Sequence, residues 1–143
     1  MRFEFEVEIE RPVHDVFAYV TDVGNLPEWQ RATSEAAWEG GDGPSVGALV
    51  RQKTRFLRRS MDIELEVTAY EPDRRFDLRT LKGPISFEVR HSFGPSRGGT
   101  KVHFVGEGEP GRFFRLAASA VARQAERESR ADFERLKAVL ESR

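Results

Sequence analysis

The sequence predicts an α+β domain in which an antiparallel sheet packs against one long C-terminal helix. Up to residue 109, most of the chain consists of segments in which apolar and polar residues alternate, which is typical of strands with one wet face. An amphipathic segment of about thirty residues, 111–141, then closes the chain. With 143 residues the chain is long enough to bury a core of its own, so we expect residues 1–143 to form a single domain.

The composition excludes several classes of function. The chain has no cysteine, so it has no disulfide, no thiolate nucleophile and no zinc site built on sulfur. Its net charge of -1 argues against a general nucleic-acid binder. No signal peptide precedes Phe3 and no apolar run approaches membrane-spanning length, so we expect a cytoplasmic protein without integral membrane association.

The first elements follow from local patterns. Residues 3–10 alternate apolar side chains with glutamates and predict a strand. Pro12 suits the first turn of a helix, whose apolar face is formed by Val13, Val16, Phe17 and Val20. Turn-forming residues at 22–27 end this helix and begin a short second one that ends near Trp29. A weaker strand is expected at 33–38, with an ambiguous inward face, and a loop at 40–47.

The next strands can be paired into hairpins by their turns and by the parity of their apolar residues. A four-residue turn at 57–60 places Arg55 opposite Asp62, Lys53 opposite Glu64 and Arg51 opposite Glu66. Turns at 72–73 and 83–84 place Glu66 opposite Arg79, Arg79 opposite Glu88 and Asp77 opposite Arg90. Opposite charges meet in every pair, which supports the register, although each pair contributes only about 0.2–1 kcal/mol. Only Arg58 and Arg59, at the first turn, stay free of this ladder.

The same pairing defines the inward face of the sheet. Its apolar members are Val50, Phe56, Met61, Ile63, Leu65, Val67, Phe76, Leu78, Ile85, Phe87, Val89, Phe93, Val102 and Phe104. Four polar residues lie among them: Gln52, Thr54, Thr80 and His91. A buried polar group without a partner costs about 1–3 kcal/mol. Either each of these groups bonds to backbone, neighbour or water, or together they line a wet cavity and orient a bound ligand.

The closing helix gives the strongest indication of a cavity. Its sheet-facing stripe runs through Ala118, Val121, Ala125, Ser129, Phe133, Leu136 and Leu140. The stripe is small in its first half and bulky in its second, which predicts space beside the first half. Phe113 and Phe114 are placed to form a lid or an apolar rim. About thirty residues rise about 45 Å, more than a ten-residue strand of about 33 Å, so the helix is expected to overhang the sheet. A homodimer contact through 123–135 is one use of that overhang.

Several segments resemble one known family. FEFEVEIERP, VHDVFAYVTDVGNLPEW, GGTKVHFVGEGE and the closing helix resemble the START-like (SRPBCC) superfamily, and more narrowly its polyketide cyclase/dehydrase-like group of small bacterial proteins. The resemblance covers nearly the whole chain and is sharpest over 12–29. It implies a helix-grip fold of order β-α-α-β6-α, with a curved seven-stranded antiparallel sheet around the C-terminal helix and a hydrophobic cavity between them. Members bind lipids, isoprenoids, polyketides or plant hormones, and only some are enzymes.

Within that fold, the residues expected to contact a small hydrophobic ligand are Gln52, Thr54, Leu65, Leu78, Thr80, Phe87, His91, Phe104, Phe114, Ala118, Val121 and Ala125. No nucleotide-binding, HExxH or nucleophile-elbow motif is present. Because the three histidines are scattered, we expect no metal and no cofactor. Glu35 is the only candidate for an inward carboxylate.

Three functions remain open. The first, which we favour because catalytic motifs are missing, is non-catalytic binding or carriage of a lipid, isoprenoid or polyketide-like ligand. The second is a cyclase or dehydratase in which His91 is the acid or base and Gln52, Thr54 or Thr80 positions a carbonyl. The third is a protein-interaction module that uses Arg58 and Arg59.

Overall fold

The computed structural model describes residues 1–41, 43–56, 58–109 and 117–143. Seven strands form one antiparallel sheet in the order β1-β7-β6-β5-β4-β3-β2. Their bounds are β1 Arg2–Ile9, β2 Thr33–Trp38, β3 Leu49–Phe56, β4 Arg59–Glu71, β5 Arg75–Lys82, β6 Ser86–Ser96 and β7 Gly99–Glu109. The seven-stranded antiparallel sheet expected from the sequence is confirmed.

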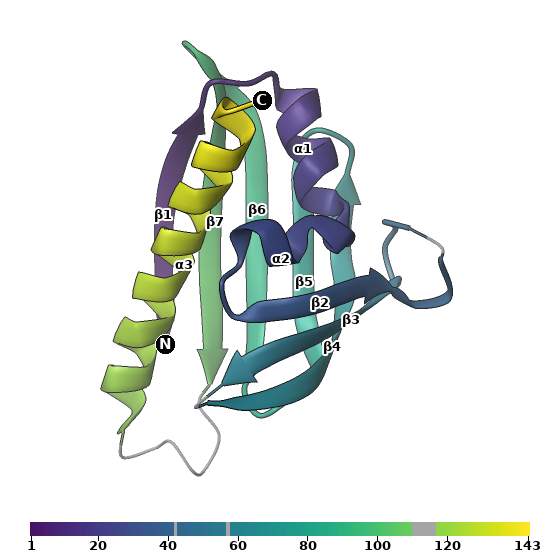
Figure 1. The fold of residues 1–143 in the computed structure, drawn as a ribbon, viewed down its shortest axis with the longest axis vertical. Helices are drawn as coiled ribbons and strands as arrows, with labels where there is room; N and C mark the ends of the chain where they lie inside the picture. Colours follow the sequence, from purple (N-terminus) through teal and green to yellow (C-terminus); the bar gives the residue numbers. More distant parts are fainter. Residues whose placement is uncertain (42, 57, 110–116) are drawn as a thin grey trace.

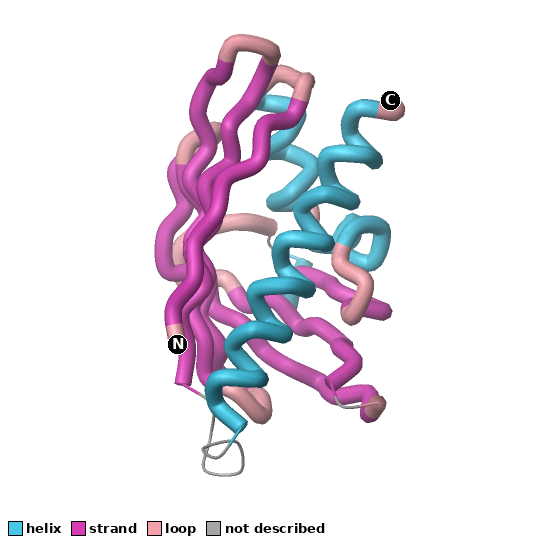
Figure 2. Tube along the Cα trace, turned by 90° about the vertical axis from the view of Figure 1, so that its left-hand side faces the viewer, coloured by secondary structure: helices cyan, strands magenta, loops and turns pink. Residues whose placement is uncertain are grey.

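The helices all lie on one face of the curved sheet (Figures 1 and 2). They are α1 Val13–Thr21, the short turns η1 Val23–Asn25 and η2 Glu39–Gly41, α2 Leu26–Trp29 and α3 Ala118–Glu141. Helix α1 buries Val16, Phe17 and Val20, which are members of its predicted apolar face. In Figure 1, α1 lies near the top of the sheet and α2 lies at mid-height just above β2, whereas α3 runs beside β1 and β7 along their length.

The register predicted for the first hairpin is wrong by two residues. Strand β3 pairs with β4 so that Phe56 faces Arg59, Lys53 faces Asp62 and Arg51 faces Glu64. Arg58 adopts a left-handed backbone conformation with a φ of 67°, which allows a turn two residues shorter than the one predicted. Side chains alternate between the two faces of a sheet with a period of two residues. A register shift of two residues therefore leaves each side chain of β3 and β4 on the face that was predicted.

The registers predicted for the later hairpins are confirmed. Arg79 lies opposite both Glu66 and Glu88, and Asp77 lies opposite Arg90. Three irregularities were not foreseen: one between Glu64 and Leu65, one between Thr33 and Glu35, and one between Val67 and Ala69. The second turns Thr33, Ala36 and Trp38 inward, while Glu35 lies on the outer face opposite Lys53, so the candidate inward carboxylate is absent from the inner face.

The described part of the closing helix is α3, Ala118–Glu141. It begins at Ala118, because Ala117 has a non-helical φ of -110° and ψ of 14°, and it has 24 residues. The rest of the predicted helix lies at 111–116, outside the described residues. A 24-residue helix rises about 36 Å, which matches the 11-residue strands β6 and β7 at about 36 Å. The lengths of the described helix and of these strands are thus equal, and the overhang stays a prediction.

The second half of α3 is fixed to the sheet by aromatic packing. The ring of Phe133 lies 5.0 Å from that of Phe104 and 5.4 Å from that of Phe5. It also lies 5.2 Å from Trp29 of α2 and 5.9 Å from His91 of β6. One side chain thus connects α3 to α2 and to three adjacent strands.

Polar contacts hold the C-terminal end of α3 beside the N-terminal elements. The amide N–H of Glu10 donates to Glu141 Oε2 at 2.8 Å. The Arg11 guanidinium donates to the carbonyl oxygen of Arg143 at 2.7 Å, and the Arg143 guanidinium lies 4.8 Å from the ring centroid of Tyr19. This end of the helix is tied to the segment between β1 and α1 and to α1 itself.

The turn between β6 and β7 gives a prediction about stability. A side chain at Gly99 would overlap the carbonyl oxygen of Ile9 and lie 2.6 Å from the backbone nitrogen of Arg11. We expect Gly99→Ala to lower the free energy of unfolding by about 2 kcal/mol or more in chemical denaturation. At Gly98 the nearest atom is 3.7 Å away, so Gly98→Ala should cost less than about 1 kcal/mol. Equal losses in the two variants would contradict this account of the turn.

Candidate functional site

The two halves of α3 meet the sheet differently. Phe133, Leu136 and Leu140 are buried, whereas Ala118, Val121, Ala125 and Ser129 in the first half of the same stripe are only half-buried. The second half of the stripe, which carries the bulky side chains, is therefore buried, and the first half, which carries the small ones, is less buried. Apolar side chains in the first half remain in contact with solvent although they belong to the sheet-facing stripe.

The inner face of the sheet is also incompletely covered. Phe3, Phe87 and Val89 pack against the core but stay half-exposed. The ring of Phe3 lies over Gly106, where an added Cβ would come within 2.7 Å of the ring. We call the half-exposed apolar residues of the two elements (Phe3, Phe87, Val89, Val121 and Ala125) the inner apolar surface.

The structure places the predicted ligand contacts in different environments. Leu65, Leu78 and Phe104 are buried in the core, while Phe87, Ala118, Val121 and Ala125 are half-exposed. Phe114 and its neighbour Phe113 lie outside the described residues.

The inward threonines and glutamine all have partners within the protein. Gln52 Nε2 donates to Thr33 Oγ1 at 2.7 Å and to Gln30 Oε1 at 3.3 Å. Thr54 donates to the carbonyl oxygen of Ala32 at 3.2 Å. Thr80 Oγ1 donates to the carbonyl oxygen of Phe87 and accepts from its amide N–H, both at 3.3 Å. These bonds offset the cost of burial without a ligand.

His91 lies in the aromatic part of the core. Its Nδ1 is 2.7 Å from the carbonyl oxygen of Phe76, and because a carbonyl only accepts, Nδ1 carries the proton. Burial lowers the pKa of His91 below its ordinary value, while the bond to Phe76 and the nearby charge of Asp77 oppose the shift. The neutral ring therefore has its lone pair on Nε2, to which none of the described residues donates a hydrogen bond. Phe133 and Phe104 pack against the ring.

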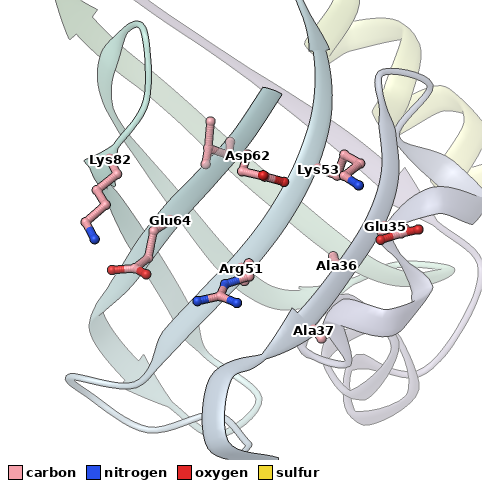
Figure 3. A pocket seen from close by; sticks show the side chains of 9 residues that line it. Glu35, Ala36, Ala37, Arg51, Lys53, Asp62, Glu64 and Lys82 are labelled. Atoms are coloured by element: carbon pink, nitrogen blue, oxygen red, sulfur yellow. The ribbon is translucent and has the colours of Figure 1, made fainter. Parts of the chain in front are cut away.

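One hollow lies on the outer face of β2–β5, with a volume of about 620 Å³. Figure 3 shows that charged side chains of both signs line it. Arg51, Lys53 and Lys82 provide positive charge, and Glu35, Asp62 and Glu64 provide negative charge. These residues belong to the cross-strand ladder, in which Lys53 faces Asp62 and Arg51 faces Glu64. Residues of opposite charge therefore face each other across the strands at this hollow, and Arg51 forms an ion pair with Glu39 at 3.2 Å.

A second hollow, of about 410 Å³, lies against α1 and was not foreseen from the sequence. We call it the α1 hollow. Phe17 of α1, Trp38 at the end of β2 and Tyr70 at the end of β4 form its aromatic wall. Asp22 and Asp73 supply carboxylates at its edge. These residues come from four separate segments, so no local sequence pattern links them.

Within the described ranges, no three histidine or acidic side chains are grouped closely enough to hold a metal ion. None of the described helices combines the length and the apolar character needed to cross a membrane.

Comparisons with solved structures show the same fold in three proteins. A protein from Rhodobacter sphaeroides superimposes with a TM-score of 0.75 at 23% identity, over 99% of this chain and 92% of that chain. Ara h 8.0201 superimposes with a TM-score of 0.77 at 14% identity, over 100% and 99% of the two chains. StfQ, the di-domain ARO/CYC from the steffimycin biosynthetic pathway, gives 0.79 at 15% identity, over 99% of this chain and 51% of StfQ.

The family comparison covers almost the entire sequence. No protein of curated function matches the sequence significantly. Residues 1–141 match the family model described as polyketide cyclase/dehydrase and lipid transport. The sheet topology, the closing helix and the structural neighbours agree with that match. The chain therefore belongs to the polyketide cyclase/dehydrase and lipid transport family and has its START-like helix-grip fold.

Proposed function

We propose that the protein binds and carries a small hydrophobic ligand, such as a lipid, isoprenoid or polyketide-like molecule, against the inner apolar surface. The observation that carries this proposal is the half-exposure of apolar residues on the inner face of the sheet and on the sheet-facing stripe of α3. A closed core would bury such side chains, since burial contributes about 25 cal/mol per Å² of apolar surface. A hydrophobic ligand bound between the helix and the sheet would cover these side chains, so that the free energy of their burial would favour binding. Membership of a family described in part as lipid transport supports the same proposal.

The polar inward residues determine how many hydrogen-bonding groups are available to the ligand. Gln52, Thr54 and Thr80 already have hydrogen-bond partners, so they offer few free groups to a polar ligand. The inner apolar surface itself consists of aromatic and aliphatic side chains. Shape and apolar contact, rather than a network of directed hydrogen bonds, would therefore select the ligand.

A substitution in the first half of α3 tests this proposal. Ala125 is half-buried on the sheet-facing stripe, so Ala125→Phe places a large ring in the proposed ligand space. We expect the variant to bind the uncharged fluorescent probe N-phenyl-1-naphthylamine about tenfold more weakly, which corresponds to about 1.4 kcal/mol. Titration of fluorescence against probe concentration measures the change.

The matched control is Ala131→Phe, because Ala131 lies on the same helix with its side chain exposed. This control should bind the probe with the affinity of the unsubstituted protein. Both variants should also unfold at the same denaturant midpoint as the unsubstituted protein. Equal affinity in Ala125→Phe, or no probe binding by the unsubstituted protein, would contradict the proposal.

A second candidate function, acid–base catalysis of cyclisation or dehydration, rests on His91. Its neutral imidazole has a lone pair on Nε2, and a base of this kind abstracts a proton from a substrate within hydrogen-bond reach. StfQ, a structural neighbour, is an ARO/CYC protein. The packing of His91 against Phe104 and Phe133 weighs against this function, since those rings occupy space that a substrate would need. We therefore place it second.

The protonation state of His91 gives a prediction for stability against pH. In the unfolded chain its pKa is about 6.5, and in the folded protein it is lower, so below pH 6.5 the unfolded state binds a proton that the folded state does not. The free energy of unfolding should therefore fall with decreasing pH from about 6.5, by up to about 1.4 kcal/mol per pH unit. Urea denaturation at a series of pH values measures this slope.

The variant His91→Phe should lose this slope, although it will be less stable at every pH because the carbonyl of Phe76 loses its donor. The control His103→Gln changes an exposed histidine that lies 2.9 Å from Glu4. It should retain the fall below pH 6.5. A slope that persists in His91→Phe would show that His91 is not held neutral by the fold.

A further inference from the structure

The α1 hollow is an open depression whose volume is that of a site for a small molecule. Its volume of about 410 Å³ lies within the range of roughly 300–1,000 Å³ that small-molecule pockets occupy. One wall is α1, and the opposite wall consists of the ends of β2 and β4, the β4–β5 turn and Gly43 with Pro44. The hollow shares none of its lining residues with the inner apolar surface.

The wall of the α1 hollow is aromatic and rests on the core. The ring of Phe17 lies 5.7 Å from that of Tyr70, and both Tyr70 and Trp38 pack against Phe76, at 6.5 and 6.2 Å. Phe76 is buried and stacks on His91 on its other side. These contacts fix the rings of Trp38 and Tyr70 while leaving the two residues half-exposed toward the hollow.

The charges at the edge of the hollow are predominantly negative. Asp22 at the end of α1 and Asp73 in the β4–β5 turn line it. Among the described lining residues there is neither lysine nor arginine. His14 lies with its Nδ1 3.1 Å from Asp73 and has a side chain that is 79% exposed. Asp73 itself has a φ of 62°, so the turn holds its carboxylate toward α1 in an uncommon backbone conformation.

Aromatic rings and carboxylates recognise one kind of ligand where the described lining has no lysine or arginine and its one basic side chain, His14, is largely exposed. A cation is attracted to the negative face of an aromatic ring, and tryptophan is the best partner for it. The two carboxylates add a Coulomb attraction of the same sign, which a neutral ligand would not experience and which an anion would oppose. From this arrangement we propose that the α1 hollow binds a small organic cation, an ammonium group on an apolar body.

The probe that tests this proposal is benzyltrimethylammonium, with neopentylbenzene as its uncharged isostere and phenylacetate as an anion. Binding is followed by ¹H–¹⁵N NMR through the indole N–H signals of Trp38 and Trp29. Trp29 is 1% exposed and serves as an internal reference. We expect the cation to shift the Trp38 signal, and the other two compounds to bind at least about tenfold more weakly.

The double variant Asp22→Asn/Asp73→Asn removes both charges and keeps the side-chain shapes. Asparagine tolerates the left-handed conformation at position 73, so the turn is retained. We expect this variant to bind the cation about tenfold more weakly. The control Asp15→Asn removes a charge from the same helix outside the hollow, where Asp15 pairs with Arg11, and should bind as the unsubstituted protein does.

Three results would overturn the proposal: no shift of the Trp38 signal with the cation, equal affinity for neopentylbenzene, or unchanged affinity in the double variant. The outcome is independent of ligand binding at the inner apolar surface, because Asp22 and Asp73 do not belong to that surface. The double variant should therefore bind N-phenyl-1-naphthylamine normally, whether or not the cation site exists.

Discussion

The packing of Phe133 is the interaction on which the arrangement of this protein depends. Its ring contacts rings from α2, β1, β6 and β7, which are brought together only when the sheet has curved and both α2 and α3 have docked. The buried residues Leu136 and Leu140 continue the contact toward the end of α3. Because the large side chains of the helix are concentrated there, its first half meets the sheet with alanines, a valine and a serine. The same distribution of volume that stabilises one end leaves apolar surface available at the other.

The sequence predicts the faces of the strands better than their registers. Parity alone assigns the inner and outer sides of β3, β5, β6, β7 and β4 as far as Val67, because every second residue points the same way. Beyond Val67 the irregularity in β4 shifts that alternation. The register of β3 with β4 is a different matter, since it depends on Arg58 having a positive φ, a conformation that arginine rarely adopts. The irregularity between Thr33 and Glu35 is equally hidden, and it decides that Glu35 lies outside. The start of α3 at Ala118 also escapes prediction, because alanine favours a helix on either side of that boundary.

Predicting the candidate site is harder, because partners in space are not neighbours in sequence. The contrast between the small and the bulky half of α3 follows directly from the order of its residues, so it could be predicted from the sequence. The partners of Gln52 could not, since Gln30 follows α2 and Thr33 begins β2, and only the folded arrangement brings them to one side chain. The α1 hollow shows the same limit more strongly. In the sequence, Trp38, Tyr70 and Asp73 have the pattern of strand-end and turn residues. Only the packing of α1 beside them creates the hollow that they line.

The asymmetric attachment of α3 also determines how the molecule can deform. Its last turn is tied to Glu10, Arg11 and Tyr19, and the ring of Phe133 packs against the sheet further along the helix. Ala118 lies about 22 Å along the axis from Phe133, so tilting the helix by about 10° about that ring displaces Ala118 by about 4 Å. Glu141 lies about 12 Å from that ring in the other direction, so the same tilt displaces it by about 2 Å. A given tilt therefore changes the space beside Ala118 about twice as much as it changes the contacts at the last turn.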